Sequence, residues 1–202
     1  MPAHTRSRLL IAGFAVIGFA FLGAACQETP SAPPVATSPA RALKVPKVLA
    51  SAQGLLWQKP LTQAVVVTRT VPSSGGSIDV PGTDFQLQIP SGAFAGQSMT
   101  FTVTALPGSI VAYDFAPHGA TFLKPLGFVQ QLGHTNWKTL SLVSGATLLL
   151  EGAYFADVAQ LDEVTGHAQV DEFFPADVNV AGATLRFPIS HFSGYMTSSG
   201  RH

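Results

Sequence analysis

The sequence predicts an all-β protein, an antiparallel β-sandwich preceded by a signal peptide and a disordered, proline-rich tether. Apolar and polar residues alternate at period two in residues 84–89 and again in residues 98–105, as in strands with one buried face. No apolar i, i+3, i+4 pattern continues for three turns, so no helix is expected. We place the signal peptide at residues 1–25, the tether at 26–60 and the sandwich at 61–202.

The composition narrows the class of protein and of partner. Charged residues make up 11% of the 202 residues, and eleven basic side chains balance eleven acidic ones. Without a basic field to attract phosphates, a nucleic-acid partner is disfavoured. Hydrophobic residues at 47%, with 14 phenylalanines, exclude a chain that is disordered throughout. A single cysteine excludes both an internal disulfide and a multi-cysteine metal site.

The first residues have the layout of a bacterial export signal. Arg6 and Arg8 precede an uninterrupted apolar run over residues 9–22, which is too short for the roughly 20 residues that span a bilayer. Small residues 23–25 lead directly to Cys26, and this segment resembles the lipobox, which is cut just before the cysteine. Here Leu22 stands one place earlier than the usual leucine. The alternative is an ordinary secretory signal cut near Ala25.

The lipobox resemblance implies an anchor. It implies a diacylglyceryl thioether on Cys26, and each buried methylene of such chains contributes about 0.8 kcal/mol to membrane binding. By family habit, Gln27 after the cysteine implies export to the outer membrane. We therefore expect a lipid-anchored protein of the bacterial cell envelope, in the outer membrane and facing the periplasm or the cell surface.

A tether is predicted between the anchor and the sandwich. Proline fixes φ and removes a backbone donor, so a proline-rich segment without apolar periodicity forms neither helix nor ladder. We treat residues 48–61 as a transition, with Leu55, Leu56 and Trp57 packed on the flank of the domain. The prolines of the tether are Pro30, Pro33, Pro34, Pro39 and Pro46.

Short strands at regular spacing, separated by turn residues, favour an antiparallel sandwich. Gly92, two residues after Pro90, suits a turn that needs a positive φ. Lys124 and Pro125 are expected to begin a strand, where a missing N–H does no harm. The predicted strands are 64–68, 84–89, 98–105, 110–115, 126–132, 147–155, 168–173, 184–189 and 192–197.

Four segments together resemble the ZU-five domain of zonula-occludens proteins, netrin receptors and ankyrins, over residues 74–197. Phe94 stands where the family has leucine, and Ala116 where it has glycine. The resemblance implies a β-sandwich, and bacterial versions commonly sit on lipoproteins without an assigned activity. The segments are Gly-Gly-Ser-Ile-Asp-Val at 75–80, Phe-Gln-Leu-Gln-Ile-Pro-Ser-Gly-Ala-Phe at 85–94, Tyr-Asp-Phe-Ala-Pro-His-Gly-Ala-Thr-Phe-Leu-Lys-Pro at 113–125 and His-Phe-Ser-Gly-Tyr at 191–195.

The usual catalytic motifs are missing from the sequence. It has no phosphate-binding loop, no His-Glu-x-x-His and no Gly-x-Ser-x-Gly, so we expect no conventional enzyme and no cofactor. Two acidic pairs at 162–163 and 171–172 flank a predicted hairpin loop. They are either a calcium site or solvated turn charges.

Trp137 is either a sugar platform or a residue at the edge of the core. The histidines after the leader are spread singly, so no metal site is predicted: His118, His134, His167, His191 and His202.

One motif carries a sharper hypothesis. In some ZU-five proteins a His-Phe-Ser motif cuts its own backbone, and His191, Phe192 and Ser193 match it residue for residue. The resemblance implies that Ser193 attacks the Phe192 carbonyl in an N-to-O acyl shift, with His191 as general base. Self-cleaving members often have tryptophan where Gly194 stands. The alternative is an ordinary terminal strand with Phe192 inward.

The sequence thus predicts a lipid-anchored envelope protein with a β-sandwich that serves scaffolding or binding. Its expected partners are the membrane, through the lipid on Cys26, and an envelope protein or glycan. Two alternatives stay open: a self-cleaving domain, and a carbohydrate- or calcium-binding sandwich.

Overall fold

The computed structural model describes residues 49–144 and 149–201, apart from the side chains of residues 141–144. These residues belong to one compact unit, Val45–His202. The predicted signal peptide, Cys26 and the tether as far as residue 48 lie outside the described residues. Within the described ranges, no helix is long and apolar enough to cross a membrane.

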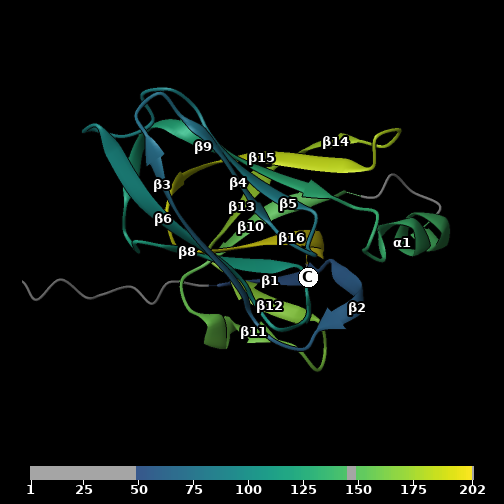
Figure 1. Ribbon diagram of the computed structural model, residues 1–202. Coiled ribbons are helices and arrows are strands. Elements are labelled where there is room, and N and C mark those ends of the chain that lie inside the picture. Colours follow the sequence, from purple (N-terminus) through teal and green to yellow (C-terminus); the bar gives the residue numbers. More distant parts are fainter. Residues whose placement is uncertain (1–48, 145–148, 202) are drawn as a thin grey trace, which may run out of the picture. The chain divides into compact units, whose positions relative to one another are not determined.

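The fold consists of antiparallel sheets arranged in layers (Figure 1). The larger sheet has nine strands, in the order β11-β12-β1-β16-β8-β6-β3, with β10 beside β16 and β13 beside β10. Its strands are β1 (Ala50–Gly54), β3 (Val65–Pro72), β6 (Ser98–Ala105), β8 (Ala112–Ala116), β10 (Glu151–Phe155), β11 (Leu161–Asp162), β12 (His167–Val170), β13 (Glu172–Pro175) and β16 (Gly194–Arg201).

A second sheet of five strands has the order β14-β15-β9-β5-β4, and a two-stranded ribbon pairs β2 with β7. Two short helices complete the described chain: α1 (Trp137–Ser144) and the single-turn η1 (Val158–Gln160). The remaining strands are β2 (Leu56–Leu61), β4 (Gly76–Val80), β5 (Phe85–Ile89), β7 (Gly108–Ile110), β9 (Thr121–Gln131), β14 (Asp177–Asn179) and β15 (Thr184–His191).

Strand β16 lies inside the larger sheet. Its first half pairs with β8 on one side and β10 on the other, and its second half pairs with β1. Residues Tyr195 and Met196 of this strand have no exposed surface. The last resolved pairings of the chain therefore hold the sheet together rather than extend its edge.

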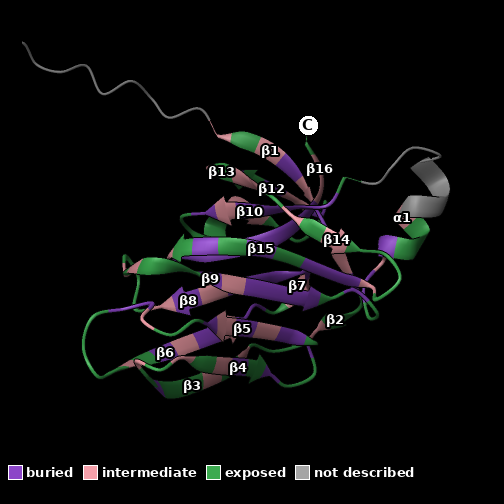
Figure 2. Cartoon of the chain, turned by 90° about the horizontal axis from the view of Figure 1, so that it is seen from above, coloured by how far each residue is buried: buried purple, intermediate pink, exposed green. Residues whose placement is uncertain are grey.

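Aromatic side chains fill the space between the two large sheets. The Phe85 ring stacks on Tyr113 of the opposite sheet at a centroid distance of 4.2 Å. Phe128 and Phe187 stack at the same distance, and Phe187 also contacts Tyr195. Along β5 and β15, buried positions alternate with exposed or half-buried ones (Figure 2). This alternation places one face of the five-stranded sheet on the core and leaves the other open.

The all-β sandwich predicted from the sequence is confirmed. Strand β6 has the predicted bounds, and Gly92 adopts the expected positive φ of 71°. Strand β9 differs, because it begins at Thr121, before Lys124. Pro125 instead lies where the register between β9 and β15 shifts, a place where a missing N–H breaks no ladder bond.

The structure corrects two boundaries. Strand β1 and all of β2 except Leu61 lie within residues 26–60, the range predicted as tether, so the folded unit begins earlier than expected. β1 contains alanine, serine and glycine rather than β-branched residues, and its place between β12 and β16 makes it a strand. The predicted strand 168–173 is in fact two strands, β12 and β13, which are separated at Asp171.

The structure also contains a helix that the sequence analysis excluded. Helix α1 spans only eight residues, which is fewer than the three turns that a helical pattern needs to be recognised. Its first turn begins with a hydrogen bond from the Leu140 amide to the Asn136 carbonyl, 3.2 Å long.

Candidate functional site

The segment His191–Phe192–Ser193 forms the passage between the two large sheets. Strand β15 of the five-stranded sheet ends at His191, and β16 of the nine-stranded sheet begins at Gly194. The peptide bond between Phe192 and Ser193 thus lies where the chain crosses from one layer to the other. Both residues are buried, with 1% and 8% of their surface exposed.

Backbone hydrogen bonds hold this crossing from both sides. The Gly119 amide donates to the Phe192 carbonyl oxygen over 3.0 Å, and the Phe192 amide donates to the Ala120 carbonyl over 2.8 Å. The Phe115 amide donates to the Ser193 carbonyl over 3.1 Å. An N–H group aimed at a carbonyl oxygen stabilises the negative charge that develops there during an attack. Gly119 therefore occupies the position of an oxyanion donor for the Phe192 carbonyl.

The imidazole of His191 faces Tyr195. The Tyr195 hydroxyl lies 3.2 Å from Nδ1 of the ring and donates a 2.8 Å bond to the His191 carbonyl. Tyr154 contacts the same ring edge-on at 4.8 Å. Among the described residues, the hydrogen-bond partner of the ring is Tyr195 and not Ser193. Burial raises the pKa of Tyr195, so its hydroxyl stays protonated and able to donate.

The first acidic pair of the predicted calcium loop, Asp162 and Glu163, already has hydrogen-bond partners within the chain. The Asp162 carboxylate accepts bonds from the Val164 amide at 3.0 Å and the Thr165 hydroxyl at 2.7 Å. These bonds lower the pKa of Asp162, and the bond from the Thr165 hydroxyl has the largest effect. Glu163 accepts bonds from the Ser109 amide at 2.5 Å and the Ser109 hydroxyl at 3.0 Å. Within the described ranges, no group of three or more histidine, cysteine or acidic side chains could hold a metal ion.

The histidines are distributed over the fold. His118 pairs with Asp114 at 2.9 Å, and His134 pairs with Asp84 at 2.6 Å. Trp137, the candidate sugar platform, is 7% exposed and belongs to the core, so it presents no ring to a ligand.

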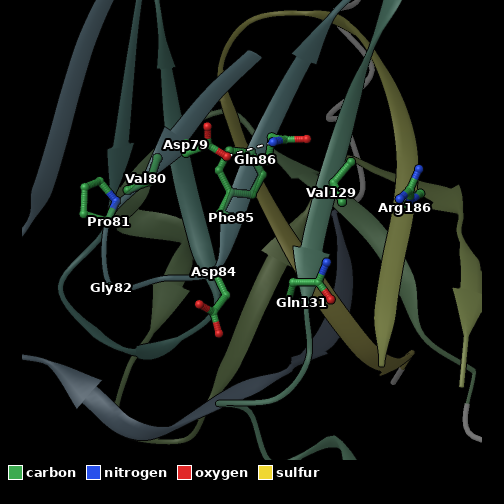
Figure 3. A pocket seen from close by; sticks show the side chains of 10 residues that line it. All are labelled: Asp79, Val80, Pro81, Gly82, Asp84, Phe85, Gln86, Val129, Gln131 and Arg186. Atoms are coloured by element: carbon green, nitrogen blue, oxygen red, sulfur yellow. Dashed lines mark hydrogen bonds between the residues drawn. The ribbon is translucent and has the colours of Figure 1, made fainter. Parts of the chain in front are cut away.

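No sequence pattern indicates the hollowed surface on the open face of the five-stranded sheet. Asp79, Gln86, Val129 and Arg186 lie in one row across β4, β5, β9 and β15 (Figure 3). They line a hollow of about 360 Å³. The glutamines of β5 were visible in the sequence only as the polar side of an alternating strand. Nothing in their spacing indicated which residues of other strands would lie beside them.

Two further hollows adjoin the first and share its walls. One, of about 560 Å³, includes Gln86, Gln88 and Gly127, and the other, of about 310 Å³, includes Gly127, Val129 and Arg186. Neighbouring hollows share lining residues, and we call the three together the outer groove. It crosses the five-stranded sheet from β4 to β15, and neighbouring strands of such a sheet lie about 4.8 Å apart.

Comparison of the sequence with protein-family models and with curated proteins gives no match. The ZU-five resemblance accordingly rests on the four sequence segments quoted above.

Proposed function

We propose that this chain is a lipid-anchored cell-envelope protein whose β-sandwich binds a partner through its surface. The observation that carries the anchor is the position of Cys26, the only cysteine in the chain, directly after an apolar leader and three small residues. A thioether-linked lipid on this residue, with two or more acyl chains, gives durable attachment to the membrane.

The structure supports a binding role for the sandwich through the outer groove. The groove is lined by side chains that have hydrogen-bonding capacity to spare, and it lies on a sheet face that no other element of the described chain covers. Concave surfaces with convergent polar groups are the usual form of a binding site.

The anchor is tested by the intact, denatured mass of the full chain extracted from membranes of a bacterial host. We expect a species that begins at Cys26 and is heavier than the bare chain by its lipid. In the Cys26→Ser variant this species disappears and the protein leaves the membrane fraction. An unmodified wild-type chain cleaved elsewhere contradicts the anchor.

Self-cleavage at Phe192–Ser193 is the second candidate, and two observations favour it. The Gly119 amide already donates to the Phe192 carbonyl, the oxygen that would carry the developing charge. In addition, β16 is paired on both sides, and Arg201 near its end binds Glu151 through two hydrogen bonds of 2.5 and 2.7 Å. A cut chain would therefore keep its last strand in place.

The chemistry of the cut balances without a cofactor. The Ser193 hydroxyl oxygen attacks the Phe192 carbonyl carbon, and its proton passes to the His191 imidazole. The Phe192–Ser193 C–N bond breaks, the freed amine takes that proton, and an ester forms. Water then hydrolyses the ester to a Phe192 carboxylate and a free Ser193 hydroxyl. For His191 to act, its ring must leave the Tyr195 hydroxyl.

Mass measurement under denaturing conditions tests the cut, because native conditions keep the two pieces together. Self-cleavage predicts a species that ends at Phe192, lost in Ser193→Ala and retained in the matched control Ser190→Ala, an exposed serine near the end of β15. A single uncut wild-type chain overturns this candidate and leaves the binding role untouched.

A further inference from the structure

The outer groove is lined by amide, carboxylate and guanidinium side chains, and we propose that it binds a neutral glycan chain. This inference rests on the proposed binding role of the sandwich and names the class of ligand. It concerns the open face of the five-stranded sheet, away from both the His191–Ser193 passage and the Asp162–Glu163 turn.

Polar side chains on one wall of the groove form a hydrogen-bonded chain. Gln88 donates from Nε2 to Oε1 of Gln86 at 2.8 Å, and Gln86 donates from Nε2 to Oδ1 of Asp79 at 2.8 Å. This chain fixes the two amides side by side and leaves a second N–H on each, together with the other oxygens of Asp79 and Gln88. The wall thus offers donors and acceptors in alternation.

Arg186 adds a cation on the opposite side of the groove. Its side chain is exposed, and no hydrogen bond or ion pair to the described residues uses its five N–H donors. In the register of the sheet it lies beside Val129, directly across from Gln86. A ligand above Val129 is therefore within reach of a guanidinium on one side and an amide on the other.

At Gly127 the floor between these walls carries no side chain. Gly127 pairs with Gln88 on one side and with Pro188 on the other. A Cβ atom at Gly127 would lie 3.3 Å from Cβ of Gln88, closer than most side-chain contacts allow. The resulting shelf, bounded by the ring of Pro125, gives an apolar seat for the C–H face of a sugar ring.

Charge decides between a neutral and an anionic ligand. Three carboxylates, those of Asp79, Asp84 and Asp177, line the hollows around the single cation Arg186. This balance repels polyanions such as nucleic acids or sulfated glycans. Vicinal hydroxyl groups both donate and accept, so they match amides, a carboxylate and a guanidinium placed side by side. The lining therefore fits a neutral polyol better than an acidic or an apolar chain.

The test uses the detergent-solubilised full chain on an array of neutral gluco-, galacto-, manno- and N-acetylglucosamine oligosaccharides, with heparin as the anionic probe. We expect binding to at least one neutral series, at least tenfold weaker in Arg186→Ala and in Gln88→Ala. The matched control Gln169→Ala, an exposed glutamine on β12 of the other sheet, keeps full affinity. Unchanged melting temperatures show that the variants are folded.

Three results overturn the inference: no binding to any neutral series, binding to heparin alone, or neutral binding that survives both groove substitutions. The Cys26→Ser variant separates this inference from the anchor, because glycan binding does not need the lipid. Glycan binding by a wild-type chain that carries no lipid refutes the anchor alone, whereas a lipidated wild-type chain that binds no glycan refutes the groove ligand alone.

Discussion

The hydroxyl of Tyr113 donates a 2.7 Å hydrogen bond to the side-chain oxygen of Gln130 and so joins the two large sheets inside the core. Both residues are completely buried. The Gln130 amide nitrogen in turn donates to the Thr83 carbonyl at 2.8 Å. A polar network of this kind stabilises the fold only while every member keeps its partner.

The Tyr113→Phe variant therefore leaves the Gln130 oxygen buried without its donor. We expect the free energy of unfolding to fall by about 1–3 kcal/mol, measured by urea denaturation. Tyr154→Phe is the matched control, because no described hydrogen bond involves the Tyr154 hydroxyl, and it should change stability by less than about 0.5 kcal/mol. Equal midpoints for the two variants would show that the network contributes nothing.

Burial raises the pKa of Tyr113 and of Tyr195 well above the ordinary value of 10.0. In the folded chain both hydroxyls therefore stay protonated at a pH where the unfolded chain has lost the proton. The unfolded state then binds fewer protons, so stability is full below about pH 10 and falls as the pH rises above it. A spectrophotometric titration should show both tyrosines ionising together with unfolding. Ionisation that precedes the loss of circular dichroism would refute this.

Gly194 sits against the ring of Phe155. A Cβ atom built on Gly194 would approach that ring to 2.0 Å, so Gly194→Ala should destabilise the protein by at least about 1–3 kcal/mol. Gly200→Ala lies in the same strand with no atom within 4 Å of its Cβ and serves as the control. Thermal denaturation of the two variants measures the difference. Similar melting temperatures would mean that Phe155 moves aside freely.

Glu163 ties the β11–β12 turn to β7. Its carboxylate accepts from the Ser109 amide and hydroxyl and from the Ile110 amide, at 2.5, 3.0 and 3.2 Å. Because the site is exposed to solvent, we expect Glu163→Ala to lower the free energy of unfolding by about 1 kcal/mol, measured by chemical denaturation. Glu172→Ala, an exposed acidic residue of β13, should be close to neutral. A neutral Glu163→Ala would show that water replaces these bonds.

The engaged carboxylates of Asp162 and Glu163 lead to an expectation for calcium. Since internal donors occupy their oxygens, millimolar calcium chloride should leave the melting temperature unchanged. A ligand that binds only the folded state would raise it. A rise that is absent in Asp162→Asn would revive the calcium alternative.

Local patterns in the sequence predicted much of the fold, because alternation in strands such as β5 and β6 requires no knowledge of their neighbours. Local sequence patterns did not predict the elements whose conformation depends on neighbouring strands or whose length is short. β1 is a strand because β12 and β16 flank it, and α1 is too short for its periodicity to be seen. For the candidate site, the His-Phe-Ser motif was visible in the sequence. The contact between the Tyr195 hydroxyl and the His191 ring could not be predicted from it.

By itself, then, the sequence determined the all-β class and the turn at Gly92, since each depends on residues close together in the chain. Only the tertiary structure decided that Phe192–Ser193 is the passage between two sheets. It alone brought Asp79, Gln86, Val129 and Arg186 from four strands into one row. Strand order and register depend on contacts between residues far apart in sequence, and no local pattern records them.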